Sequence, residues 1–317
     1  MRWPGPNEAS REACFPRTLG PPPGTRPRVA HQFEANSILH RGAGLRPLGF
    51  VRTLRPVKLL FIGDIVGEPG RRAVKTLVPR LRERHGIQFV IANAENSAGG
   101  SGVSLGTAKE IFDGGVDVIT TGDHLWDNRD VTQLLPNEPR FLRPANYPAG
   151  VPGRGGAVFR KEGLPPIAVL NVQGRTFMAA QLENPFAVAE AEVARLRAET
   201  PIVFIDFHAE VTSEKIALGW FLDGKVSAIV GTHTHVQTAD ERILPQGTAC
   251  LTDAGFTGGH GGVLGREWPP IVERFLRQTP QKFGVCETDV KLSGCVIEID
   301  EITGKAVSII RVSEPLP

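Results

Sequence analysis

Residues 226–235 read VSAIVGTHTH, a short apolar run that ends in two histidines with one residue between them. The run has the length and the composition of a buried β-strand. Alternate residues of an extended segment share one face, so His233 and His235 are expected to point to a common place. Such a pair is typical of a metal site, but a polar loop can also contain two histidines by chance. The rest of the sequence has to decide between these interpretations.

Four other apolar runs end in the same kind of side chain. VKLLFIG is followed by Asp64, FVIANA by Glu95 and Asn96, VDVITTG by Asp123 and His124, and PIVFIDF by His208. Each residue alone has an ordinary explanation, such as a helix cap, a solvated loop or a hydrogen-bonded core histidine. In α/β sheets, however, ligands bind beyond the carboxyl ends of the strands. Five such strand ends therefore favour one shared site at a common sheet edge.

The segments between these runs have the spacing of helices. Helical patterns cover 74–86, 105–115, 184–199 and 213–224, with Asn184 as an N-cap followed by proline. Further strands are expected at 155–163 and 167–174, and residues 291–314 read as a hairpin with a turn near Thr303 and Gly304. Strands that alternate with helices predict an α/β fold whose sheets are covered by helices, and the added antiparallel strands predict mixed sheets.

The types of candidate ligand narrow the chemistry. Carboxylates, imidazoles and an amide, without cysteine, suit Mn, Fe, Zn or Co better than a thiolate zinc site or an all-oxygen calcium site. The set exceeds the need of one tetrahedral ion and consists of Asp64, Glu95, Asn96, Asp123, His208, His233 and His235. Two ions about 3.5–4 Å apart would use all of these side chains, in the arrangement that clamps an in-line displacement at phosphorus.

At this point the motifs resemble those of a known family. GDIVG, NAEN, GDHLWD, FHAE and GTHTH follow the order of the metallophosphoesterase superfamily. The similarity is greatest to the YmdB-like branch, which comprises bacterial 2′,3′-cyclic-nucleotide 2′-phosphodiesterases, and it extends from Val57 to Val312. The resemblance implies a metallophosphoesterase-like sandwich of two mixed β-sheets flanked by helices, with a dinuclear site at the strand ends.

The resemblance also implies a role for each candidate residue. One ion, divalent or trivalent, would be held by Asp64, Glu95, Asn96 and His235, and the other by Glu95, Asp123, His208 and His233. Glu95 would then bridge two ions of Fe, Mn or Zn. His124 would remain unligated and would protonate the leaving oxygen after attack by a hydroxide that bridges the metals.

Two positions depart from the usual superfamily pattern. Val66 stands where many members have a histidine, and Asn96 would supply a ligand in its place, as in the YmdB-like branch. Asp123 stands where the usual motif has asparagine. The extra carboxylate would balance the charge that two divalent ions bring, whereas an amide would leave about one positive charge for an anionic substrate. The carboxylate of Asp123 would also favour a trivalent iron at one of the two metal positions.

The expected reaction is the hydrolysis of cyclic nucleotides, 2′,3′-cyclic and also 3′,5′-cyclic. Three alternatives remain open: a phosphomonoesterase, a nuclease, and a metal-bound regulator that senses nucleotides with little turnover. From residue 57 onwards the chain has 27 basic and 31 acidic residues, so it is mildly acidic. This charge argues against a long nucleic acid and favours a small nucleotide substrate. A homo-oligomer is left open.

The first 56 residues differ from the rest of the chain. They contain nine arginines, three glutamates and nine prolines and show no sustained apolar period, so we expect a disordered extension followed by one metallophosphoesterase domain over 57–317. A further hypothesis is that this extension is not translated and that Val57 is the start. The four cysteines have no CxxC spacing, and no apolar run approaches the ~20 residues of a membrane span. These features predict a cytoplasmic protein with reduced thiols.

Overall fold

The computed structural model of the protein describes residues 56–317. The predictions made for the first 56 residues, namely disorder and the absence of translation, therefore lie outside the described residues apart from Pro56. The same holds for the predicted reduced state of Cys14.

The first β-sheet has seven strands and is mixed. Strands β1, β3 and β4 run parallel, while the long strand β12 is antiparallel to β1, β11 and β13. The short strand β2 pairs with β11 at the edge of the sheet. The strands are β1 (Val57–Ile62), β2 (Asp64–Ile65), β3 (Phe89–Asn93), β4 (Val118–Thr120), β11 (Phe256–Gly259), β12 (Val290–Ile299) and β13 (Ala306–Pro315).

The second β-sheet has six strands in the order β5-β6-β7-β8-β10-β9. Its four central strands are parallel, and an antiparallel strand lies at each edge. The strands are β5 (Gly156–Phe159), β6 (Ile167–Gln173), β7 (Val203–His208), β8 (Ala228–Thr232), β9 (Arg242–Ile243) and β10 (Ala249–Leu251). Both sheets are therefore mixed, as the sequence predicts.

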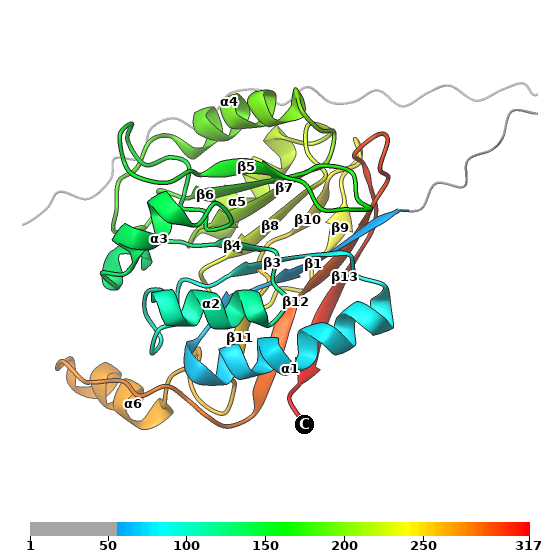
Figure 1. Ribbon diagram of the computed structural model, residues 1–317. Helices are drawn as coiled ribbons and strands as arrows, with labels where there is room; N and C mark the ends of the chain where they lie inside the picture. The colour runs from blue at the N-terminus through cyan, green and yellow to red at the C-terminus, as the bar shows by residue number, and fades with distance from the viewer. Residues whose placement is uncertain (1–55) are drawn as a thin grey trace, which may run out of the picture. The chain divides into compact units, whose positions relative to one another are not determined.

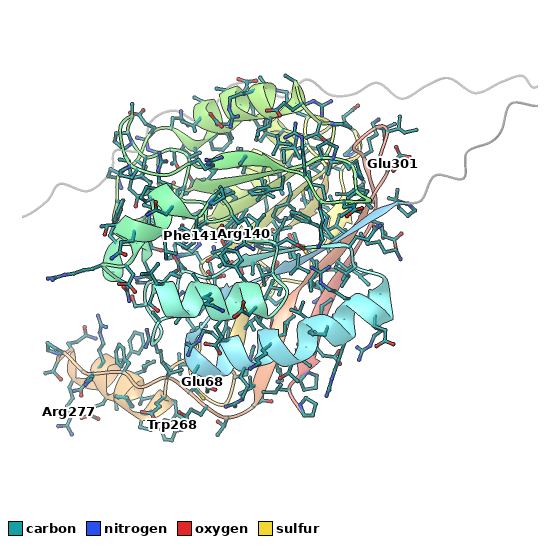
Figure 2. The ribbon with its side chains drawn as sticks, in the orientation of Figure 1. Glu68, Arg140, Phe141, Trp268, Arg277 and Glu301 are labelled. Carbon is teal, nitrogen blue, oxygen red and sulfur yellow. The ribbon has the colours of Figure 1, made fainter. Side chains whose placement is uncertain are left out.

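Helices cover the outer faces of the two sheets. The helices α1 (Gly67–His85), α2 (Leu105–Asp113) and α3 (Val131–Asn137) pack against the first sheet, and α4 (Pro185–Arg197) and α5 (Thr212–Phe221) pack against the second. Figure 1 shows α1 and α2 on one side of the sandwich and α4 on the opposite side. The helix α6 (Trp268–Arg277) buries none of its residues. In Figure 2, where its first and last residues are labelled, it lies away from both sheets.

The alternation of side chains along β1 shows why the layers form. Leu59 and Phe61 point into the core between the sheets, whereas Leu60 and Ile62 point into the core under the helices. Phe61 meets Phe204 of the second sheet with ring centroids 4.9 Å apart. A strand that is apolar on both faces can be buried only between two layers, so its sequence requires a sheet on one side and helices on the other.

The predicted fold class, a sandwich of two mixed sheets flanked by helices, is confirmed. The predicted helices and the predicted terminal hairpin are present. The sequence patterns did not identify the helices α3 and α6 or the short strands β2, β9, β10 and β11. Within residues 56–317, none of the helices combines the length and the apolar character that crossing a membrane requires.

Candidate metal centre

The candidate ligands come from the carboxyl ends of five parallel strands. These are β1, β3 and β4 of the first sheet and β7 and β8 of the second. The sequence predicts that all five strand ends lie at the edge of one sheet. The structure instead divides them between two sheets whose strand ends meet at the same end of the sandwich, where Asn93 of β3 donates to Asp206 of β7 at 3.0 Å. His208 is the last residue of β7 and does not follow it.

Four of the predicted ligands form one compact group, composed of Glu95, Asp123, His208 and His233. One ligand atom from each of them lies within 4.8 Å of all the others. The His208 Nε2 atom is 2.9 Å from Asp123 Oδ1 and 3.3 Å from Glu95 Oε2. The His233 Nδ1 atom is 3.2 Å from the same Asp123 oxygen and 3.1 Å from His208 Nε2. We call these four residues the first group.

The remaining predicted ligands lie beside the first group. Asn96 Nδ2 is 3.0 Å from Glu95 Oε1 and 3.2 Å from His235 Nε2. Asp64 Oδ2 accepts the backbone N–H of His233 at 3.0 Å, and its Oδ1 is 3.8 Å from His208 Nδ1. A half-turn of the Asn96 amide would place its oxygen where the nitrogen now lies. We call Asp64, Asn96 and His235 the second group, after the assignment that the family resemblance implies, and Glu95 of the first group also contacts Asn96 of the second.

The two histidines of GTHTH do not share one face of an extended segment, so that prediction is wrong. Both have a left-handed backbone, with φ 95° at His233 and φ 63° at His235. The turn directs His233 toward His208 and Asp123, and it directs His235 toward Asn96. The chain therefore delivers one imidazole to each group.

Burial makes the carboxyl groups of the site resist ionisation. Burial, followed by the charge of Asp253, raises the pKa of Asp64 to about 7. The pKa of Glu95 is raised well above its usual value, first by burial and then by the charges of Asp123 and Asp64. At Asp123, burial also acts to raise the pKa, but the interactions with His208 and His233 outweigh it and the pKa is lowered.

The imidazoles are affected by the same burial. It lowers the pKa of His208 to about 3 and the pKa of His235 to about 4, so both rings are neutral at physiological pH. Burial acts in the same direction at His233, but the hydrogen bond and the charge of Asp123 outweigh it and raise the pKa. Neutral imidazole is the form that binds metals.

The donor set fits a metal ion. Asp64 Oδ1 is buried and has no hydrogen-bond partner among the described residues. A buried polar atom without a partner is rare, and three buried or half-buried carboxylates this close together repel one another. A cation in their midst would satisfy the free oxygen and would offset the repulsion. Carboxylate oxygens and imidazole nitrogens are the ligands that divalent transition metals prefer.

His124 lies beside the first group with an exposed side chain. Its backbone N–H donates to Glu95 Oε2 at 3.2 Å. Its Nδ1 lies 2.8 Å from Asp127 Oδ2 and 3.2 Å from Ser101 Oγ, and the serine hydroxyl also donates to Asp127. The Nδ1 atom is thus held by neighbours, which leaves Nε2 for a substrate.

Sequence reasoning missed several polar residues around the site. Asp127 is three residues after His124 within GDHLWD, a spacing that could have identified it as the partner of the ring. Glu210 lies 3.1 Å from His233 Nε2 and belongs to the FHAE motif. Asp206 is buried and accepts from Thr120 at 2.5 Å and from Thr232 at 2.7 Å, and alternation along β7 places it on the same face as His208.

Known proteins with similar sequences and structures match most of the chain. The family described as YmdB-like protein matches residues 60–312. A Bacillus subtilis 2′,3′-cyclic-nucleotide 2′-phosphodiesterase is 48% identical over 256 residues, which are 81% of this chain and 96% of that protein. A hypothetical protein from Thermus thermophilus is 37% identical with a TM-score of 0.77, over 82% of this chain and 100% of that one. A novel phosphatase from Mycoplasma pneumoniae is 33% identical with a TM-score of 0.76, over 84% of this chain and 96% of that one.

The substitution Gly122→Ala is expected to abolish metal binding. A Cβ atom at this position would lie 2.2 Å from the His208 ring and 2.3 Å from Glu95 Oε2, so the first group could not keep its arrangement. Metal analysis after dialysis against Mn²⁺ would measure the loss. Gly106→Ala is the matched control, because its Cβ would meet no atom closer than 3.8 Å. Parental metal content in Gly122→Ala would contradict the assignment of this group.

Metal affinity is expected to fall as the pH is lowered below about 7. Asp64, whose pKa burial raises to about 7, then holds a proton that a metal must displace, and the raised pKa values of Glu95 and His233 act in the same direction. His208 and His235, whose pKa values lie near 3 and 4, contribute nothing in this range. Each displaced proton should weaken binding about tenfold per pH unit. Competition with a chelator between pH 5.5 and 8 would measure this slope, and a constant affinity would refute the explanation.

Proposed function

The chain belongs to the YmdB-like protein family, and from that membership we propose that it is a phosphodiesterase that hydrolyses cyclic nucleotides at a centre of two metal ions. The motif resemblance seen in the sequence is confirmed by the family match, and the named relatives support a phosphoesterase hydrolase. The proposal adds the number of ions, the role of each residue and the class of substrate.

The position of Glu95 is the observation that carries the proposal. Its Oε2 lies beside His208, while its Oε1 lies beside Asn96, which in turn contacts His235. A carboxylate with one oxygen toward each group is suited to bridge two ions. We assign Asp123, His208 and His233 to one ion and Asp64, Asn96 and His235 to the other. Fe, Mn and Zn suit this donor set.

The bound ions would neutralise charge on the phosphate and would supply a water acidic enough to act as a nucleophile near pH 7. The residues of the chain complete the site. His208 is oriented by Thr232, whose hydroxyl lies 3.0 Å from Nδ1 and donates to Asp206. This bond leaves Nε2 free to act as a ligand, which is the role that such an outer hydrogen bond has at metal-binding histidines.

His124 is proposed to donate a proton to the departing ribose oxygen. Asp127 and Ser101 hold its Nδ1, and its backbone N–H is anchored on Glu95. The ring is therefore fixed next to the centre without being a ligand of it. A positioned imidazole is the most frequent proton donor in enzymes.

The substrate is proposed to be a small nucleotide. The Bacillus subtilis relative is named for 2′,3′-cyclic nucleotides, and a 3′,5′-cyclic nucleotide presents the same diester charge. A second candidate is a phosphate monoester, because the Mycoplasma pneumoniae neighbour is described as a phosphatase. A nuclease is less favoured, because the chain from residue 57 onwards is mildly acidic and would repel a long nucleic acid. A nucleotide-sensing regulator would bind the ligand without hydrolysing it.

One experiment separates these candidates. The purified protein, loaded with Mn²⁺, Fe or Zn²⁺, would be assayed on 2′,3′-cyclic, 3′,5′-cyclic, monoester and oligonucleotide substrates. The proposal expects two ions per chain and the fastest turnover on a cyclic nucleotide. Preferred turnover of monoesters would establish the phosphatase instead. Tight binding of a cyclic nucleotide without hydrolysis would establish the regulator.

His124→Ala should lower turnover by about 10²–10⁴-fold, because the leaving oxygen then lacks its proton donor. Both metals should remain bound, since the ring is not assigned as a ligand. Steady-state kinetics together with metal analysis would measure both effects. His85→Ala, at the end of α1, is the control and should match the parent. Loss of a metal in His124→Ala would instead reassign His124 as a ligand.

Asp123→Asn should keep the fold while changing metal preference or turnover. Asp123 Oδ1 lies 2.9 Å from His208 Nε2 and 3.2 Å from His233 Nδ1, and an amide oxygen could occupy the same place without the charge. The less negative centre should favour divalent over trivalent iron and should attract an anionic substrate more strongly. Metal content and kinetics would be compared in parent and variant. Identical values would refute the charge argument.

A further inference from the structure

A buried ion pair lies directly behind the two histidines of GTHTH. Lys215 Nζ is 2.6 Å from Asp253 Oδ2, and the two side chains are only 2% and 1% exposed. Among the lysine and arginine ion pairs of residues 56–317, no other pair is buried so deeply. Removing two charges from water is costly, and a buried pair is weak evidence for stability alone. The pair therefore calls for another explanation.

The Asp253 carboxylate holds Thr234, the residue between the two histidines. Its Oδ2 accepts the Thr234 backbone N–H at 3.2 Å and the Thr234 hydroxyl at 2.8 Å. Its Oδ1 accepts the backbone N–H of Gly255 at 2.8 Å, which fixes the carboxylate within its own loop. One side chain thus ties the GTHTH turn to the loop between β10 and β11.

The backbone of the GTHTH turn has a conformation that needs stabilising contacts from its surroundings. His233 and His235 both have positive φ, a conformation that the Cβ atom disfavours. Such residues remain in place only when their surroundings over-determine them. Thr234 joins the two, so a shift of its backbone moves both imidazoles, one in each group of candidate ligands.

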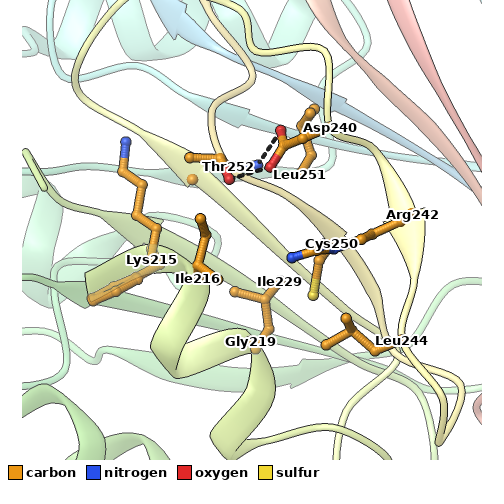
Figure 3. A pocket seen from close by; sticks show the side chains of 12 residues that line it. Lys215, Ile216, Gly219, Ile229, Asp240, Arg242, Leu244, Cys250, Leu251 and Thr252 are labelled. Atoms are coloured by element: carbon orange, nitrogen blue, oxygen red, sulfur yellow. Dashed lines mark hydrogen bonds between the residues drawn. The ribbon is translucent and has the colours of Figure 1, made fainter. Parts of the chain in front are cut away.

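Lys215 links this turn to the strand that carries His208. It lies on α5, the helix that follows β7, and its stem lies against Gly231 of β8, where a Cβ atom would approach the lysine Cδ to 2.8 Å. Figure 3 shows the lysine stem beside Ile216, with the ammonium group directed away from Cys250 and Leu244. Lys215 and Asp253 therefore join the connections after β7, β8 and β10.

We propose that Lys215, Asp253 and Thr234 form a clamp that positions His233 and His235 together and thereby sets both metal positions at once. The inference rests on the proposed two-metal function and assigns to the three residues a positioning role, not a role in chemistry. A defect in the clamp should therefore weaken the binding of both ions, whereas loss of a single ligand such as His235 should weaken the binding of chiefly one ion.

The substitution Thr234→Val tests the clamp, because it removes the hydroxyl and preserves the shape of the side chain. Dissociation constants for Mn²⁺ would be determined from the electron paramagnetic resonance signal of free Mn²⁺. Both ions should bind about 10–100-fold more weakly, the usual effect of losing a partner that orients metal ligands. Thr234→Ser keeps the hydroxyl and should retain parental affinity.

Thr248→Val is the matched control. Thr248 is a buried threonine near the opposite end of the same sheet, and its hydroxyl donates to Val226 at 2.7 Å. Its loss should leave Mn²⁺ affinity unchanged. Parental affinity in Thr234→Val, or weakening of one ion only, would overturn the clamp. Failure of the parent to bind two ions would overturn the proposed function, and with it this inference.

A metal-free measurement gives a second readout. Hydrogen–deuterium exchange over residues 232–236 should accelerate in metal-free Thr234→Val and not in Thr248→Val, because only the former releases the turn. Asp253→Asn should show the same exchange effect, provided that its circular dichroism spectrum matches that of the parent. Unchanged exchange in both Thr234→Val and Asp253→Asn would show that the ion pair does not hold the turn.

Discussion

The structure brings three carboxyl groups, Asp64, Glu95 and Asp123, to one place where water is largely excluded. Like charges that share a buried site destabilise one another unless protons, hydrogen-bond donors or cations compensate. The neighbouring imidazoles outweigh burial at Asp123 but not at Asp64, one oxygen of which has no hydrogen-bond partner among the described residues. A cation bound among these carboxyl groups would offset their repulsion and would satisfy the free oxygen of Asp64.

The architecture explains how such a cluster can be held without collapse. Each side chain follows or ends a strand that is buried on both faces, so packing of the sheets and helices fixes the strand ends. Hydrogen bonds then fix the ligands themselves: Thr232 and Asp206 orient His208, and Asp253 holds the turn between His233 and His235. Rigid supports of this kind position ligands more precisely than free loops do.

Much of this could be predicted from the sequence. The apolar runs predicted most of the strands, and the polar residues at their ends predicted the four side chains that the structure gathers in the first group, because the carboxyl ends of parallel strands are where ligands gather. The division of the strand ends between two sheets was not derivable from the runs, since pairing partners depend on long-range packing. The different neighbours of His233 and His235 were not predicted, because positive φ at histidine leaves no sequence signal. Lys215 and Asp253 looked like ordinary helix and loop residues until the structure placed them in contact.

Anomalous diffraction from a crystal of the Mn²⁺-loaded protein would test the central claim most directly, since it locates the ions relative to named side chains. The account predicts two peaks about 3.5–4 Å apart, with Glu95 between them. One peak would lie beside Asp123, His208 and His233, and the other beside Asp64, Asn96 and His235. A single peak, or peaks away from Glu95, would contradict it.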